Sequence, residues 1–145
     1  MGDATKIFLT SGLTLIGGVL IYVFGQIIIR FFVDPYQHYR QVVGEIADVL
    51  SYYANISGGS HRQRQDEASN VFRQKARLLR VKAYEIPYYN QFAKWKWVFP
   101  WSSIMEASSA LISLSNDIYR HDHEAIKQRR DVIIENLKLP SLGLR

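Results

Sequence analysis

The stretch "GGVLIYVFGQIIIRFFVDPYQ", from Gly17 to Gln37, decides how this chain is organised. It is almost wholly apolar, yet it carries one glutamine and one arginine and then stops at an Asp-Pro pair. The apolar run begins earlier, at Ile7, and a helix from there to Ile29 would be roughly 34 Å long, against a hydrocarbon core of about 30 Å. Backbone amides in lipid must pair within their own segment, so a spanning stretch of this kind is a helix. We therefore predict a single-pass membrane anchor over residues 7–33.

Two other interpretations of this run are less favoured by its length and composition. A secretory signal has a shorter apolar centre and a small-residue cleavage site, and no such site follows here. A helix that is apolar on all sides can also be the core of a soluble protein, but it then needs a larger domain to surround it. The chain has only 145 residues, which allows one modest domain and an appendage.

The composition excludes several kinds of site. The chain has no cysteine, so disulfides, thiolate metal sites and cysteine nucleophiles are absent. It has 18 lysine and arginine residues against 13 acidic residues, a net charge of +5. Lysine and arginine in excess mark the cytoplasmic side of a membrane segment. Lys6 precedes the anchor, whereas Arg30 lies near its C-terminal end and Arg40 and a later basic cluster follow it, so we expect the N-terminus outside and the C-terminal domain in the cytoplasm.

Small side chains recur along one face of the predicted anchor. Ser11, Gly18 and Gly25 repeat every seven residues, and Thr14 falls on the same side. Such a face lets two helices approach closely in lipid, and Gln26 beside it can form an interhelical hydrogen bond worth about 0.6 to 2 kcal/mol. We predict that this small-residue stripe packs on a second copy or on another membrane helix. The alternative is that the glycines are incidental and that the glutamine reaches the interface.

The rest of the chain has the pattern of an all-α domain over residues 34–139, between the anchor and a short C-terminal tail at 140–145; residues 1–6 form an N-terminal tail. Asp34 and Pro35 suit an N-cap and a first helical turn, so we expect one helix to end or bend there and another to begin. Apolar residues at spacings of three and four predict about four helices. These helices are expected over 35–55, 66–85, from about 103, and over 122–137. Ser103 and Glu106 have the spacing of a capping box, and no run alternates as a strand does.

A basic segment, "RQRQDEASNVFRQKARLLRVK" from Arg62 to Lys82, is the first candidate site. Arg73, Arg77 and Arg80 fall on one helix face, where like charges repel unless an anion or a carboxylate relieves them. Anionic lipid headgroups or a phosphate-bearing ligand would do so. The alternative is a solvated face that is salt-bridged within the bundle, with Glu45, Asp48 or Glu106 as partners. No nucleic-acid-binding motif accompanies the patch, so nucleic acid is not an expected partner.

An aromatic segment, "YYNQFAKWKWVFPW" from Tyr88 to Trp101, is the second candidate. It holds Trp95, Trp97 and Trp101, which are all three tryptophans of the chain, and Lys94 and Lys96 alternate with the first two. We rank three interpretations. A cap on the bundle core or a subunit interface comes first, since tryptophan and tyrosine dominate interfaces. A contact with the membrane interface comes second, and a ligand pocket third.

No catalytic, cofactor or metal site is expected from the sequence. The cluster "RHDHE" resembles a metal site, but His121 and His123 are two residues apart and cannot share a helix face. Asp122 as an N-cap with Glu124 near the helix dipole explains the same residues. No nucleophile elbow or phosphate loop occurs. We therefore expect the protein not to be an enzyme.

Two stretches, "DPYQHYRQVVGEIADVLSYYAN" and "EASSALISLSNDIY", resemble a family of short bacterial single-pass membrane proteins of unassigned function. The resemblance covers less than half of the chain and lends no functional residues, but it implies a bacterial inner membrane. The first functional hypothesis is a scaffold or accessory subunit that self-associates as a homo-oligomer or joins another membrane protein. The alternative is an oligomeric membrane effector or pore former that is regulated by an anionic ligand on the basic helix.

Overall fold

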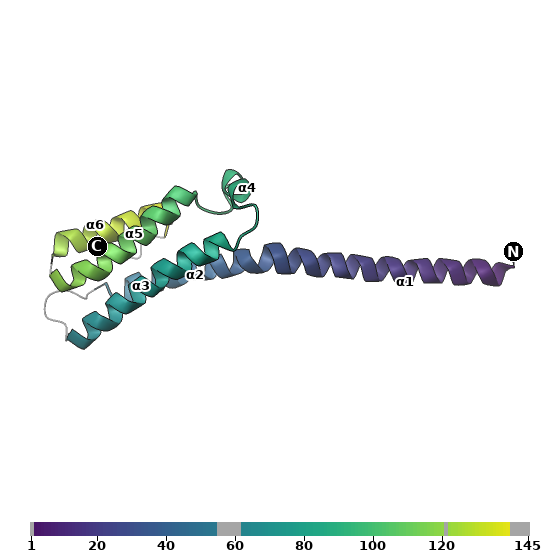
Figure 1. Cartoon of the computed structure of the whole chain (residues 1–145), viewed down its shortest axis with the longest axis horizontal. Helices are drawn as coiled ribbons and strands as arrows, with labels where there is room; N and C mark the ends of the chain where they lie inside the picture. Colours follow the sequence, from purple (N-terminus) through teal and green to yellow (C-terminus); the bar gives the residue numbers. More distant parts are fainter. Residues whose placement is uncertain (1, 55–61, 121, 140–145) are drawn as a thin grey trace.

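The computed structural model describes residues 2–54, 62–120 and 122–139, and of residues 3–9 it describes the backbone alone. Within these ranges every regular element is a helix and no strand occurs, so the all-α prediction is confirmed. A long helix projects from one end of a helical bundle, and the chain begins at the far tip of this helix (Figure 1).

The projecting helix is a single continuous rod made of three elements. α1 (Asp3–Ile28) passes into a π-helical turn, η1 (Ile29–Val33), which passes into α2 (Asp34–Tyr52). At 1.5 Å per residue the rod is about 75 Å long. In the described part of the chain it is the one helix long and apolar enough to cross a membrane.

The prediction that a new helix is capped at Asp34 is wrong. The residue in the N-cap position of α2 is Val33, and no side chain caps the helix. Instead the amide of Asp34 donates to the carbonyl of Ile29, five residues back. Proline in a helix interior lacks an amide and clashes with a carbonyl of the preceding turn, and a local π turn is a known way to accommodate this. Pro35 therefore changes the helical register without ending the rod.

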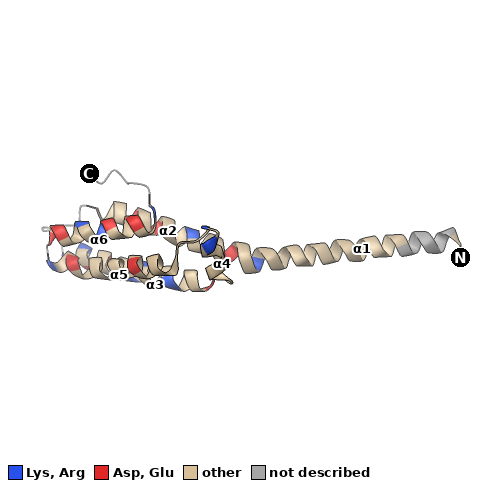
Figure 2. Cartoon of the chain, turned by 90° about the horizontal axis from the view of Figure 1, so that it is seen from above, with Lys and Arg blue, Asp and Glu red and all other residues tan. Residues whose placement is uncertain are grey.

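The bundle consists of α2 and three further long helices: α3 (Arg62–Tyr84), α5 (Trp101–Asp117) and α6 (His123–Asn136). α3 packs against both α2 and α5, and α5 packs against both α3 and α6. A 3-10 turn, η2 (Ile118–Arg120), follows α5. A short helix that the sequence did not predict, α4 (Tyr89–Lys94), lies between α3 and α5. Figure 2 shows α4 at the end of the bundle nearest to α1.

The predicted apolar stripes form the core of the bundle. Tyr39, Ile46, Leu50, Leu79 and Ile133 are completely enclosed, and Phe72 is almost so. Of the other positions in these stripes Ala54 is only partly buried, and the rest are buried: Val42, Val43, Tyr53, Ala68, Ala76, Ala83, Ile104, Ala107, Leu111, Leu114, Ile118, Ile126 and Leu137. Burial of such side chains, at about 1.5–3 kcal/mol for each large one, is what stabilises the bundle.

Of the two other predicted helix caps, one is confirmed and one is wrong. Asp122 caps α6 as expected, because its carboxylate accepts a hydrogen bond of 3.0 Å from the amide of Ala125. The capping box at Ser103 and Glu106 is wrong, since α5 already begins at Trp101 after Pro100. Proline fixes the backbone at the start of this helix, and Ser103 lies within its first turn.

Candidate functional site

The strongest candidate site is formed where the rod enters the bundle. α3 ends just before Pro87, and the chain then passes through α4 beside the π turn. The two ends of α4 have a left-handed backbone at residues that are not glycine, with φ of 54° at Tyr88 and 61° at Lys96. Each such residue costs about 1–2 kcal/mol, so the surrounding contacts must hold this conformation.

Aromatic rings supply these contacts. The ring of Phe32, in the π turn, is stacked on Tyr88 with 6.5 Å between centroids and lies 6.4 Å from the ring of Phe92. Tyr36 in α2 lies 6.4 Å from Trp97. Pairs at these separations each stabilise by about 0.5–1.5 kcal/mol beyond the area that they bury. The short helix is therefore fixed to the rod at the point where the apolar run ends.

The rings of the segment also contact one another. Phe92 lies 5.9 Å from Trp95 and 5.6 Å from Trp97, and the two tryptophans are 6.1 Å apart. Tyr89 meets Trp101 edge-on at 5.7 Å. We call Tyr88, Phe92, Trp95, Trp97 and Trp101 the aromatic collar. Phe92, Trp95 and Trp97 form one cluster, which Phe32 links to Tyr88, whereas Trp101 joins the collar through Tyr89.

Two tyrosines, the buried Tyr39 and the partly buried Tyr89, join the collar to the bundle core. The hydroxyl of Tyr89 donates to the carbonyl of Phe99 at 2.6 Å, and the amide of Phe99 donates to the hydroxyl of Tyr39 at 3.4 Å. Burial raises the pKa of Tyr89 to about 12 and raises the pKa of Tyr39 further, because it disfavours the phenolate. Val98, beside them, is buried in the core. One side of the segment thus caps the core.

The other side of the collar faces outward. Trp95 is 59% exposed, Trp97 57% and Trp101 42%. Tryptophan is rarely left uncovered to this extent, and three exposed rings together usually mark a contact surface. Lys94 and Lys96, which alternate with Trp95 and Trp97, are also exposed. The collar is therefore both a cap on the core and an exposed apolar surface.

The three arginines of the basic helix do not form one free site. Arg73 is bound within the bundle: its Nε donates to the hydroxyl of Ser115 at 3.1 Å, and its terminal nitrogen donates to Asn116 at 2.8 Å. The acidic partner proposed as an alternative is thus wrong for this arginine. Glu45 instead pairs with Lys75 at 2.8 Å.

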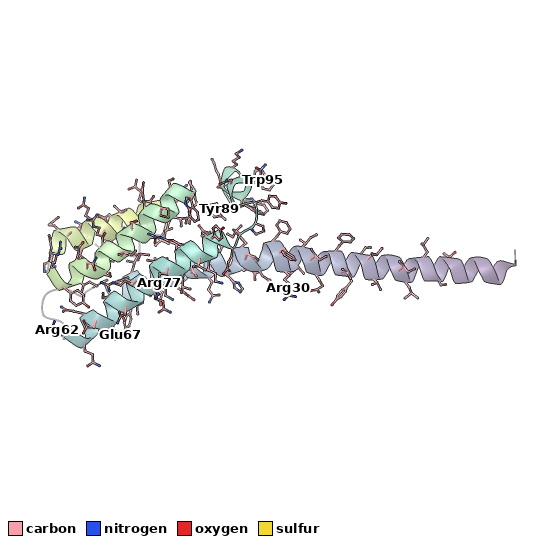
Figure 3. The ribbon with its side chains drawn as sticks, in the orientation of Figure 1. Arg30, Arg62, Glu67, Arg77, Tyr89 and Trp95 are labelled. Carbon is pink, nitrogen blue, oxygen red and sulfur yellow. The ribbon has the colours of Figure 1, made fainter. Side chains whose placement is uncertain are left out.

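The other two arginines have different surroundings. Arg77 lines an open surface groove with Arg73, Asn70, Gln74 and Ile112. Arg80 is half-buried, and its Nε has no hydrogen-bond partner among the described residues. Figure 3 shows Arg77 part-way along the bundle, away from the junction where Arg30 and Trp95 lie. Arg77 therefore lies apart from the collar.

The small-residue stripe of α1 is open along its whole length. Ser11, Thr14, Gly18 and Gln26 are exposed, Gly25 is partly so, and a Cβ built on either glycine meets nothing within 4 Å beyond the adjacent helix backbone. The hydroxyl of Thr14 donates to the carbonyl of Thr10 at 2.9 Å, so it is satisfied within the helix. The side-chain amide of Gln26 has no hydrogen bond to any residue that the structure describes.

The described residues contain no group of three or more histidine or acidic side chains that could hold a metal ion. His121, from the cluster considered for metal binding, lies outside the described residues. His123 begins α6, next to the capping Asp122.

Comparison of the chain with family models, with curated proteins and with solved structures finds no match. The resemblance to short bacterial single-pass membrane proteins therefore stays a prediction.

Proposed function

We propose that the protein is a non-enzymatic scaffold or accessory subunit of the bacterial inner membrane, which self-associates through its anchor and holds the bundle at the cytoplasmic face. The observation that carries the proposal is the uninterrupted rod. No loop separates the apolar α1 from the core-forming α2, and Tyr39, one turn past Pro35, is already fully buried in the bundle.

A continuous helix makes the position of the bundle depend on the position of the anchor. A flexible linker would let the two parts rotate freely, whereas a helix fixes each residue about 100° from the previous one. When two anchors pack along one face, the two bundles are then held in one relative orientation. This property suits a protein that presents binding surfaces in an ordered assembly.

The open stripe of α1 supports self-association. Side-chain-free positions at Gly18 and Gly25 let a second helix approach closely, where dispersion contacts are gained in lipid. The side-chain amide of Gln26, which has no partner among the residues described, lies beside them and is costly to leave facing acyl chains. A second anchor helix can pack closely on the two glycines and also provide a hydrogen-bond partner for Gln26.

Crosslinking of the full chain in bacterial membranes tests the proposal, with Gly18→Leu and Gln26→Leu as variants. We expect each to reduce the crosslinked dimer several-fold, because the first separates the helices and the second removes a hydrogen bond of about 0.6 to 2 kcal/mol. Gly17→Leu is the matched control, since it adds the same side chain about 100° around the helix. Unchanged crosslinking in the first two variants, or an equal loss in the control, contradicts assembly through this stripe.

A further inference from the structure

The exposed apolar side chains of the bundle are not evenly distributed. Most of the large ones lie at the end nearest to the anchor, where α3 ends, α4 forms and α5 begins. This group comprises Val81, Tyr84, Tyr88, Trp95, Trp97, Trp101 and Met105, whereas Tyr52, Ile112 and Tyr119 lie elsewhere. Figure 1 shows α4 beside the point where the rod leaves the bundle. An uncovered aromatic surface is therefore concentrated on the side that faces the anchor.

The collar lies at the level of the lipid headgroups if α1 spans the bilayer. The apolar run reaches Arg30, and the collar is attached to the rod at Phe32 and Tyr36. At 1.5 Å per residue these rings lie roughly 3 to 9 Å beyond the arginine along the helix. The headgroup zone adds about 5 to 7 Å to each side of the hydrocarbon core. Tryptophan and tyrosine rings are enriched at this depth in membrane proteins.

The charge around the collar is complementary to an anionic surface. From Ile86 to Met105 the chain has two lysines, Lys94 and Lys96, and no acidic residue. Figure 2 shows basic residues in and next to α4, beside the junction with the rod. Arg30 adds a third cation, on the opposite side of the rod from Trp95 in Figure 3. One acidic residue, Asp34, directly follows the π turn. The three cations Lys94, Lys96 and Arg30 therefore outnumber it where the rod leaves the apolar zone.

We propose that the aromatic collar is a second membrane contact, which inserts its tryptophan rings into the lipid interface and binds anionic headgroups through Lys94 and Lys96. This inference rests on the part of the proposed function in which α1 spans the bilayer. An anchored chain keeps the collar permanently close to lipid, so a weak contact is sufficient. The tryptophan rings bury their apolar surface in the lipid interface, while the lysine ammonium groups contact lipid phosphates. Each lysine increases binding to an anionic membrane surface about fivefold.

The second contact determines how the bundle stands on the membrane. The rod alone allows the bundle to tilt and to rotate about the membrane normal. A collar that is fixed to the rod by Phe32 and Tyr36, and also held in the interface, removes part of this freedom. Anionic lipid content would then control the orientation of the bundle.

The tryptophans themselves report on this contact, because all three of the chain lie in the collar. The full chain is reconstituted in phosphatidylcholine vesicles with and without phosphatidylglycerol, and its fluorescence is quenched by lipids brominated near the headgroup or near the chain end. We expect stronger quenching by the shallow bromine, and an increase of about twofold or more in that quenching with phosphatidylglycerol. Acrylamide in the aqueous phase should quench weakly.

Two variants separate the lipid contact from simple proximity. Lys94→Gln with Lys96→Gln should abolish the increase caused by phosphatidylglycerol, while Lys127→Gln, exposed near the start of α6, should leave it unchanged. Neither change touches the core, so both proteins are expected to keep the helical circular dichroism of the parent.

Three outcomes overturn the inference. Tryptophans that are quenched by acrylamide and not by either bromolipid would face water. Tryptophans that are shielded from all three quenchers would be buried against another copy or another protein. A phosphatidylglycerol effect that persists without the two lysines would not be headgroup binding by the collar. Extraction with alkaline carbonate distinguishes these failures from failure of the anchor, because a chain without a spanning α1 would leave the vesicles altogether.

Discussion

α1 and α2 are two halves of one rod, and their apolar side chains have opposite environments. Leu20, Ile21 and Phe24 in α1 are more than half exposed, whereas Tyr39, Ile46 and Leu50 in α2 have no exposed surface. The backbone is helical in both halves and passes from one to the other through a single π turn. The difference therefore lies in the side chains and in what each half packs against.

The pattern of the side chains explains this difference. α2 has apolar residues on one face and polar residues on the other, so protein can cover the apolar face while water solvates the rest. α1 is apolar on all sides, and no element of the bundle packs along it. A helix of this kind is stable only in a surrounding that is itself apolar, which is why lipid is its expected environment.

The largest expected effect comes from placing a charge in α1. Leu20→Arg should prevent insertion of most of the protein, because an arginine near the centre of a spanning helix costs about 3 to 4 kcal/mol relative to leucine. The fraction of protein that resists carbonate extraction measures this. Leu20→Ile is the control and should insert normally. Unchanged resistance to extraction in the arginine variant would mean that the protein is held on the membrane without α1 crossing the bilayer.

The second largest effect is expected from a change in the buried core of the bundle. Phe72→Ala should lower the free energy of unfolding by about 3–5 kcal/mol, because this ring is almost fully buried and lies 5.8 Å from the ring of Tyr53. Denaturant titration of the full chain in detergent, followed by tryptophan fluorescence, measures the change. Val81→Ala, on an exposed position of the same helix, should change it by no more than about 0.5 kcal/mol. Equal effects would contradict the assigned core.

The junction between the halves should respond to a smaller change. Tyr89→Phe removes the hydrogen bond to the carbonyl of Phe99 and should cost about 1 kcal/mol of stability at neutral pH. Burial raises the pKa of Tyr89 to about 12, above that of a free tyrosine. The unfolded chain therefore loses its proton first, and stability falls as the pH rises from about 10 towards 12.

The loss of stability at alkaline pH provides a second test of the Tyr89→Phe variant. In Tyr89→Phe the fall in stability over that pH range should be shallower, with the part due to Tyr39 remaining. Unfolding measured at several alkaline pH values provides the test. An identical pH dependence in parent and variant would show that the hydroxyl of Tyr89 is not buried.

The smallest effect concerns the surface of the bundle. Glu45 accepts a hydrogen bond from Lys75 at 2.8 Å, and this contact lowers the pKa of the carboxyl group. Its stabilisation is present at neutral pH and is lost as the pH falls below the ordinary range of glutamate. Both side chains are partly exposed, so Glu45→Gln should cost only a few tenths of a kcal/mol at pH 7 and nothing in acid. Melting temperatures at the two pH values check this, and a cost that is the same at both would exclude the ion pair as its cause.

Local patterns along the chain were sufficient for much of the fold. The apolar face of α2, the stripe of α3 and the cap at Asp122 depend on residues three or four apart, and all three are confirmed. The caps at Asp34 and Ser103 failed because the backbone nearby was fixed by prolines, through a π turn in one case and an earlier helix start in the other.

The candidate site was only partly visible in the sequence. The density of aromatic residues in 88–101 identified the collar, but nothing local placed it on Phe32, which lies more than fifty residues earlier in the chain. The spacing of Arg73, Arg77 and Arg80 was read correctly as one helix. It gave no sign that Arg73 is bound by Ser115 and Asn116, which are 42 and 43 residues away.

The sequence by itself determined that α1 is apolar all round and that the bundle helices are amphipathic, because these properties depend on residue type and on the 3.6-residue period alone. Only the tertiary structure decided that the two parts form one rod, that the collar lies beside the π turn, and which arginines remain free. Those outcomes depend on contacts between distant residues, and such contacts are selected by the packing of the whole bundle.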